Sequence, residues 1–205
     1  MQRIGLMGGS FNPIHNGHLN MARAALDGGF VDRVLFLPSG DPPHKRQGVV
    51  DKAHRLAMVE LAAEGFDRAD VCRMEIEREG KTYTVDTLTQ LTSEHPDERY
   101  VYLIGADTLV TLHTWRRPED VVRLCALLVA QRPGEDNAAL MQAAAYWRAR
   151  GAQIDFMPIE PMDVSSTQIR ALAANGESLE GLVPAAVGAY IRAHGLYDAK
   201  EDQAR

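Results

Sequence analysis

Residues 3–18 read RIGLMGGSFNPIHNGH and contain the strongest indication of the fold class. Its first five residues, Arg3–Met7, form a short apolar run of the kind that builds buried strands. Gly8 and Gly9 follow at once, and paired glycines let the backbone turn sharply and approach a ligand without a Cβ atom in the way. A helical pattern begins at Gly17. The stretch therefore predicts a strand, a tight loop and a helix, the first repeat of an α/β fold.

Strand-like and helical patterns alternate along the rest of the chain. The expected strands are Arg3–Met7, Arg33–Leu37, Asp70–Ile76, Tyr100–Ile104, Ala126–Ala130 and Gln153–Met157. The expected helices are Gly17–Asp27, Asp51–Glu64, Thr84–Glu94, Pro118–Leu124, Asn137–Arg150, Ser166–Asn175 and Pro184–His194. This alternation predicts a doubly wound (Rossmann-like) parallel sheet with helices on both faces and a C-terminal helical segment. We expect one domain over residues 1–198 and a polar, frayed tail over 199–205.

Composition excludes several classes of protein. A net charge of -6 over 205 residues argues against broad binding to nucleic acid or to anionic membranes, both of which require a positive surface. The two cysteines, Cys72 and Cys125, lie in apolar stretches, which favours buried thiols over a disulfide framework or a zinc site. The N-terminus lacks the apolar region of a signal peptide, and no apolar run reaches the roughly 18 residues of a membrane span. We expect a cytoplasmic protein.

The residues after the first strand favour a phosphate site. They match neither Gly-x-Gly-x-x-Gly nor a P-loop. His15 lies just before the expected helix and His18 in its first turn, where backbone N–H groups and the helix dipole favour an anion. Two imidazoles there add hydrogen-bond donors for phosphate oxygens. Each histidine taken singly is more often incidental, and a zinc pair would need a further Asp, Glu or Cys nearby. The pair flanking Gly17 makes a phosphate site the better interpretation.

A second set of donors precedes the expected helix that starts at Ser166. Ser165, Ser166 and Thr167 supply three hydroxyl groups, and Arg170 follows one turn later. Ser165 with Gln168 has the spacing of a capping box, so a purely structural cap is one interpretation. A helix start with hydroxyl donors and an arginine clamp is also a phosphate site. By itself the motif leaves both interpretations open.

The middle of the chain holds further candidates that follow expected strands or begin expected helices. Lys45 ends a proline-rich loop, and a solvated surface lysine is the favoured interpretation from the sequence alone. Asp107 follows the fourth expected strand, where a carboxylate can accept hydrogen bonds from ribose hydroxyls. Trp115 is either a core residue or a platform on which a flat ring stacks, whereas Trp147 on an alanine-rich helix is expected to be buried.

The two donor motifs resemble the signatures of the nucleotidylyltransferase superfamily with an (H/T)-x-G-H motif. The second matches (I/V)-S-S-T-x-I-R throughout, and the first has Ser10 and Asn12 where the usual form has Thr and Asp. Taken in order, the middle segments are similar to those of bacterial nicotinate-nucleotide adenylyltransferases: PPHK around Lys45, TYTVDTL from Thr82, GAD from Gly105 and the Trp115 segment. The resemblance covers nearly the whole chain and is weakest over residues 135–152.

The resemblance implies transfer of AMP from ATP to nicotinate mononucleotide, with release of pyrophosphate. It implies that Mg²⁺ accompanies ATP without a dedicated protein cage. The residues expected at ATP are Gly8, Gly9, Ser10, Phe11, His15, His18, Gly105, Asp107, Ser166, Thr167 and Arg170. Those expected at the nicotinate nucleotide are Lys45, Tyr83, Thr84, Asp107 and Trp115. His15, His18, Lys45 and Arg170 are the expected catalytic set.

Several alternatives stay open at this point. The acceptor could be nicotinamide mononucleotide or, for a shorter chain without the Thr82 and Trp115 segments, phosphopantetheine. A non-catalytic nucleotide sensor is the rival from another class. Arg116 and Arg117 have no role that the sequence assigns. Both a monomer and a homo-oligomer are compatible with these residues.

Overall fold

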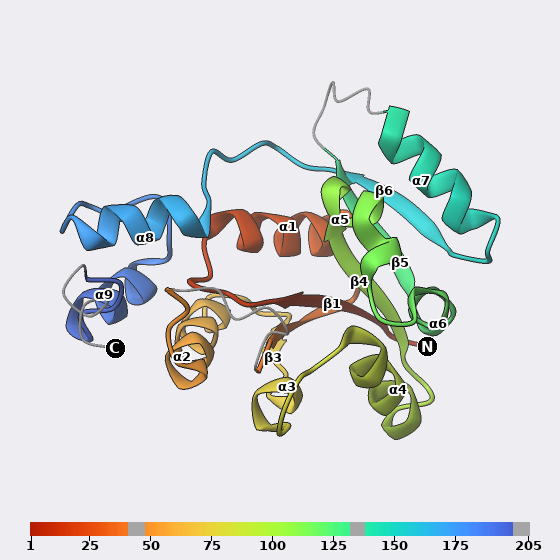
Figure 1. Ribbon diagram of the computed structural model, residues 1–205, viewed down its shortest axis with the longest axis horizontal. Coiled ribbons are helices and arrows are strands. Elements are labelled where there is room, and N and C mark those ends of the chain that lie inside the picture. Colours follow the sequence, from red (N-terminus) through yellow and green to blue (C-terminus); the bar gives the residue numbers. More distant parts are fainter. Residues whose placement is uncertain (41–47, 132–137, 199–205) are drawn as a thin grey trace. The chain divides into compact units, whose positions relative to one another are not determined.

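The computed structural model describes residues 1–40, 48–131 and 138–198 (Figure 1). Its strands are β1 (Arg3–Gly9), β2 (Arg33–Pro38), β3 (Ala69–Val71), β4 (Arg99–Gly105), β5 (Ala126–Gln131) and β6 (Ile154–Pro158). Its helices are α1 (Asn16–Asp27), α2 (Lys52–Ala63), α3 (Met74–Glu77), α4 (Thr84–Glu94), α5 (Ala106–Thr111), α6 (Pro118–Leu124), α7 (Ala138–Arg148), α8 (Ser166–Ala174) and α9 (Ala185–Ala193), with a 3₁₀ turn, η1 (Leu112–Thr114).

The strands form one six-stranded parallel sheet in the order β3-β2-β1-β4-β5-β6. β1 pairs with β4, β4 with β5, and β5 with β6, all in parallel. The direction in which successive strands are added reverses at β1, so the topological switch point lies between β1 and β4. Ligands of open α/β sheets bind outside the carboxyl ends of the strands at such a point. The predicted Rossmann-like α/β fold is confirmed.

The chain forms two compact units, each made of three separate segments. Unit 1 comprises residues 1–8, 20–35 and 82–161, and unit 2 comprises residues 9–19, 36–81 and 162–205. In unit 1, Figure 1 shows α1 and α4 on opposite faces of the sheet, as expected for a doubly wound fold. The single domain predicted over residues 1–198 stays a prediction, and the predicted tail, 199–205, lies outside the described residues.

Most predicted elements are confirmed to within two residues, and the exception is Asp70–Ile76. There β3 ends at Val71, and the Cys72 N–H still donates to the Phe36 carbonyl at 2.9 Å. The chain then forms the single helical turn α3, in which Arg78 N–H donates to the Met74 carbonyl. Lys52 Nζ donates to the Ile76 carbonyl at 2.7 Å and so satisfies an acceptor that the short turn leaves free.

The remaining predictions about helices and buried residues have mixed outcomes. The sequence also missed α5, which begins directly at the end of β4 without a linker. Asn137, the predicted start of α7, lies outside the described residues. Trp147 is buried, as predicted. Neither cysteine forms a disulfide bond, and Cys125 is buried whereas Cys72 is half-buried, so the prediction of two core thiols is half right.

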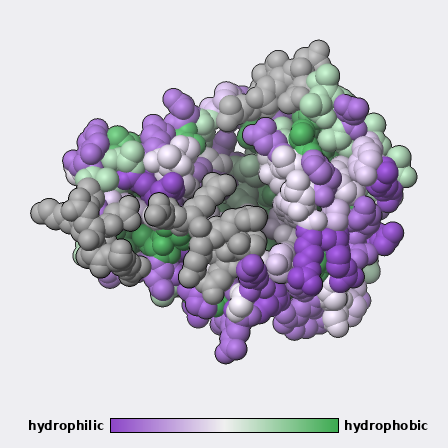
Figure 2. All heavy atoms as spheres, viewed as in Figure 1, coloured by the Kyte–Doolittle hydropathy of each residue, from purple (hydrophilic) through white to green (hydrophobic). Residues whose placement is uncertain are grey.

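Helix α7 has one buried side and one exposed side. Its buried residues include Leu140, Ala144 and Trp147, whereas Met141 and Tyr146 are exposed. In Figure 2 the alanine-rich region at the upper right has a pale green surface. Within the described ranges, none of the helices combines the length and the apolar character that a membrane crossing requires. The cytoplasmic location and the choice between monomer and homo-oligomer stay predictions.

Candidate active site

Residues 9–18, from the last residue of β1 into the first turn of α1, are held in unit 2 by hydrogen bonds from Ser39 and Arg55; we call this segment the phosphate loop. The Ser39 N–H donates to the Gly9 carbonyl at 2.9 Å. The guanidinium of Arg55, a residue only 1% exposed, donates to the carbonyls of Ser10 and Gly40, each at 2.7 Å. These carbonyls are occupied by structural donors, and the N–H groups of Asn16 and His18 are likewise bonded, to the carbonyls of Leu182 and His15.

Asn12 fastens the phosphate loop with both ends of its side-chain amide. Its Nδ2 donates to the Gly48 carbonyl at 2.9 Å, and its Oδ1 accepts from the Val50 N–H at 3.2 Å and from the Tyr197 hydroxyl at 3.0 Å. An ionised aspartate has no donor for the Gly48 carbonyl. Asn12, which stands where the similar family motif has Asp, therefore makes a hydrogen bond to Gly48 that an ionised Asp could not make.

His15 and His18 lie face to face in the phosphate loop. Their ring centroids are 3.7 Å apart with planes at 29°, and the edge of Phe11 lies against His18 at 5.1 Å. The backbone N–H of His15 donates to His18 Nδ1 at 3.2 Å. A neutral His18 that accepts at Nδ1 must carry its proton on Nε2. The fold thus presents His18 Nε2–H as a hydrogen-bond donor.

Both imidazoles are neutral near pH 7. Burial lowers the pKa of His15 from 6.5 to about 4. Burial, and secondarily the neighbouring His15, lowers the pKa of His18 to about 3. His15 Nδ1 is buried and has no hydrogen-bond partner among the described residues. In this state the pair supplies N–H donors without positive charge, and among the described residues Arg55 and Arg170 bring formal positive charge to the loop.

Gly17 is required by the close approach of His15. A Cβ atom at position 17 would lie 3.1 Å from His15 Nδ1 and 3.1 Å from Val164 Cγ1. Contacts that close are tighter than side chains normally make, so with a larger residue the His15 ring or Val164 must shift. The glycine between the two histidines therefore favours their close packing.

The start of α8 is joined directly to the phosphate loop. Ser165 is the N-cap, and its Oγ accepts from the Gln168 N–H at 3.2 Å, which confirms the capping interpretation for that residue. Ser166 Oγ donates to the Pro13 carbonyl at 2.9 Å. Arg170 donates through Nη1 to the Asn12 carbonyl at 2.8 Å and through Nη2 to Thr167 Oγ1 at 3.2 Å. The motif is thus a cap and, at the same time, part of the same cluster as the histidines.

The predicted ATP-site residues of the phosphate loop and of α8 therefore lie together in unit 2. Gly9 and the exposed Ser10 begin the loop, whereas Phe11 is buried. Lys45 lies outside the described residues, and its role stays a prediction.

Four of the predicted nicotinate-site residues, Tyr83, Thr84, Asp107 and Trp115, belong to unit 1. Tyr83 is the N-cap of α4 and makes no side-chain capping bond, so the first N–H groups of the helix have no side-chain acceptor from their own cap. Trp115 is partly exposed, and Tyr102 meets its ring edge-on, with centroids 5.7 Å apart. The partial exposure of Trp115 favours the stacking-platform interpretation over the core one.

Three further predicted residues of unit 1 lie at the carboxyl ends of β1 and β4. Gly8 lies under Tyr102, because a Cβ atom there would come within 2.0 Å of the Tyr102 hydroxyl oxygen. Gly105 is the N-cap of α5 and has open space where a Cβ would stand. Asp107 is exposed in the first turn of α5, where its charge suits the helix dipole.

The sequence did not indicate the structural roles of four residues. Arg55, Asn12 and Tyr197 hold the phosphate loop by hydrogen bonds, and Tyr102 contacts Trp115. A charged residue in the apolar pattern of α2 was the available signal for Arg55, since a buried guanidinium must find acceptors. Tyr197 is remote in sequence from the loop that it contacts, and no local pattern indicates such a pair. Burial raises the pKa of the Tyr197 phenol. Among the described residues, no group of three or more His, Cys, Asp or Glu side chains could hold a metal ion.

The chain is similar to known proteins over most of its length. A family model described as cytidylyltransferase-like matches residues 6–172. A protein of Synechococcus sp. (strain JA-3-3Ab), named probable nicotinate-nucleotide adenylyltransferase, is 43% identical over 199 residues, which are 96% of this chain and 95% of the relative. A protein of the same name from Bordetella petrii is 41% identical over 197 residues, covering 96% of this chain and all of the relative.

Solved structures share the fold. The nicotinic acid mononucleotide adenylyltransferase of Plasmodium falciparum complexed with NaAD superposes with a TM-score of 0.78 at 16% identity, over 96% of this chain and 98% of that chain. A likeness at this level of identity establishes the architecture, and the residues of the candidate site rest on the geometry above.

Proposed function

The chain belongs to the nicotinate-nucleotide adenylyltransferase family, and we propose that it transfers AMP from ATP to nicotinate mononucleotide in NAD biosynthesis, giving nicotinate adenine dinucleotide and pyrophosphate. The observation that carries this proposal is the cluster in unit 2. There Ser166 and Arg170 of α8 donate hydrogen bonds of 2.9 and 2.8 Å to the carbonyls of Pro13 and Asn12, in the same loop that carries the two histidines.

The donor types in this cluster suit a polyphosphate. A phosphate oxygen of the acceptor attacks the α-phosphorus of ATP, a new P–O bond forms, and the bond from that phosphorus to the oxygen bridging to the β-phosphate breaks. The nucleophile is already ionised at neutral pH, so no general base is required. Catalysis then depends on alignment and on stabilising charge as it moves toward the departing pyrophosphate.

Each residue of the cluster has a role that follows from its donor. His18 Nε2–H and His15 donate to oxygens of the α- and β-phosphates, where charge develops. Ser166, Thr167 and Arg170 hold the β- and γ-phosphates, with the guanidinium as the fixed positive charge. Lys45 is proposed to contact an incoming or leaving phosphate.

The acceptor is proposed to bind at the aromatic residues of unit 1. Trp115 offers a ring face for the pyridine. The backbone N–H groups at Tyr83 and Thr84 supply donors for the nicotinate carboxylate, since α4 begins there. Gly105 and Asp107 border the nucleoside, with the Asp107 carboxylate accepting from ribose hydroxyls.

Mg²⁺ is proposed to arrive with ATP. The described residues of the cluster are N–H and O–H donors and a guanidinium, which suit phosphate oxygens, and none of them is a carboxylate of the kind that commonly binds Mg²⁺. Phosphate oxygens and water would therefore hold the ion, which would supply charge neutralisation on the polyphosphate.

One assay tests this function against its rivals. The purified chain receives ATP and Mg²⁺ with nicotinate mononucleotide, nicotinamide mononucleotide or phosphopantetheine, and pyrophosphate is measured. We expect the highest kcat/KM with nicotinate mononucleotide. A higher kcat/KM with nicotinamide mononucleotide would show that this nucleotide is the preferred acceptor. ATP binding without pyrophosphate from any of the three would favour the non-catalytic sensor.

A further inference from the structure

Two adjacent residues of unit 1, Trp115 and Arg116, are each held by a tyrosine from a different element. The Trp115 ring meets Tyr102 of β4 at 5.7 Å with an interplanar angle of 78°. The Arg116 guanidinium lies over the ring of Tyr83, with Cζ 4.5 Å from the ring centroid. A guanidinium on an aromatic face is held by cation–π attraction. The two contacts fix the position of a positive charge next to the proposed pyridine platform.

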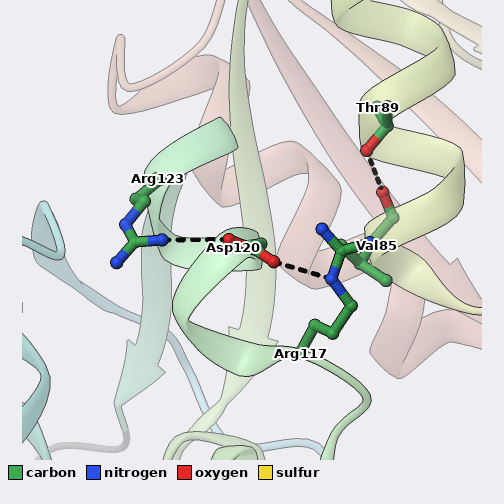
Figure 3. Close-up of polar contacts among 5 residues, drawn as sticks. All are labelled: Val85, Thr89, Arg117, Asp120 and Arg123. Atoms are coloured by element: carbon green, nitrogen blue, oxygen red, sulfur yellow. Dashed lines mark hydrogen bonds and ion pairs between the residues drawn. The ribbon is translucent and has the colours of Figure 1, made fainter.

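Arg116 differs from its neighbour in how its charge is used. Arg117 forms an ion pair with Asp120, Nε to Oδ2 at 2.7 Å, and Asp120 also pairs with Arg123 at 3.0 Å (Figure 3). Within the ranges that the structure describes, Arg116 has no carboxylate partner. The positive charge of Arg117 is thus offset inside the protein, whereas that of Arg116 is left for a ligand.

The place of Tyr83 connects this charge to the acceptor. Tyr83 immediately precedes Thr84, and these two residues are the ones proposed to receive the pyridine substituent. The two acceptors that the reaction must distinguish differ only at that substituent, a carboxylate in one and a neutral carboxamide in the other. Backbone N–H groups alone donate to either oxygen, whereas a nearby formal charge favours the carboxylate.

We propose that Arg116 is a specificity-determining residue, whose guanidinium on the Tyr83 ring favours an acceptor nucleotide with a pyridine carboxylate over one with a carboxamide. This inference rests on the proposed function. It assigns Arg116 to substrate choice and Arg117 to the surface of α6.

The test compares R116Q with R117Q, which removes the same charge one residue away. For wild type and both variants, kcat/KM is measured with nicotinate and with nicotinamide mononucleotide, and binding of each nucleotide is measured by calorimetry at low and high salt. We expect R116Q to lower the preference for nicotinate mononucleotide about tenfold, the scale of a hydrogen bond to a charged group. R117Q should change it less than twofold. Salt should reduce the preference of wild type and of R117Q more than that of R116Q.

The outcomes separate this inference from the function beneath it. If R116Q kept the wild-type preference for nicotinate mononucleotide, or if R117Q lost as much of it as R116Q, the proposed role of Arg116 would be wrong. Turnover by the wild type would still support the proposed function. If wild type released no pyrophosphate with either nucleotide, the proposed function would fail, and the calorimetric ratio would still decide whether Arg116 selects a carboxylate. R116K supports the proposal if it retains part of the preference, because it keeps the charge and loses the planar stack.

Discussion

At the scale of single residues, His18 shows how the backbone selects one of two tautomers. The His15 N–H occupies His18 Nδ1, so the proton of the neutral ring lies on Nε2. Burial lowers its pKa, which keeps the ring neutral. A neutral donor of this kind stabilises developing negative charge on a phosphate oxygen through its N–H dipole, without having to be protonated beforehand.

Replacing His18 by alanine should lower kcat by about 10²- to 10³-fold and leave the fold intact, because one preorganised donor to the transition state is lost. Steady-state kinetics and circular dichroism measure the two effects. His95→Ala, at an exposed position after α4, serves as the control and should keep wild-type kcat. More than half of wild-type activity in the His18 variant would remove it from the catalytic set.

Trp115 carries the second residue-scale prediction. Trp115→Ala should raise KM for nicotinate mononucleotide about tenfold or more, and much more than KM for ATP, because lost stacking costs about 1 to 3 kcal/mol. Tyr146→Ala removes an exposed aromatic ring from α7 and is the matched control. Equal increases in both KM values would show that Trp115 supports the fold and does not bind the pyridine.

At the scale of elements, the carboxyl ends of β1 and β4 fit together through one glycine and one tyrosine. The Tyr102 hydroxyl occupies the space where a side chain at position 8 would stand, and the Tyr102 ring also contacts Trp115 in a T-shaped arrangement. The glycine that the sequence suggests for ligand approach is therefore also required by packing within unit 1.

Gly8→Ala tests this fit. A Cβ atom 2.0 Å from the Tyr102 hydroxyl oxygen forces the buried ring to move, and overpacking of this kind costs about 1 to 3 kcal/mol of unfolding free energy. In Gly8→Ala/Tyr102→Phe the hydroxyl is gone, and we expect part of that loss to be recovered. Urea denaturation of wild type, both single variants and the double variant gives the coupling. Strict additivity would mean that the contact does not explain the glycine.

At the scale of the whole molecule, the buried histidines link stability to pH. Their pKa values are lower in the folded protein than the 6.5 expected when the chain is unfolded. Between about pH 4 and 6.5 the unfolded chain therefore binds more protons. The free energy of unfolding should accordingly fall as the pH is lowered through this window, and it should be fully present above it.

For His15 alone the loss between pH 7 and pH 4 should be about 3 kcal/mol, since each pKa unit is worth about 1.4 kcal/mol. Urea denaturation at several pH values should show a shallower decline in His15→Gln than in wild type. His95→Gln should follow the wild-type curve, because His95 is exposed. Parallel curves for wild type and His15→Gln would contradict the lowered pKa of His15.

Much of the fold was predictable from the sequence because strands and helices leave short-range patterns. The strand predicted over Arg3–Met7 and the helix cap predicted at Ser165 are both confirmed, since each depends on residues within one strand or one turn. Asp70–Ile76 was read wrongly as one strand, because a single helical turn after three strand residues is stabilised from outside, by Lys52.

The sequence by itself determined the order of strands and helices, the glycine-rich turn and the two donor motifs, because these depend on near neighbours along the chain. Only the tertiary structure decided that Arg170 and Ser166 reach the carbonyls of Asn12 and Pro13, more than 150 residues away. It also decided the tautomer of His18 and the lowered pKa values. The burial of a side chain and its hydrogen-bond partners depend on which distant segments the fold brings together. A pattern of neighbouring residues in the sequence does not predict them.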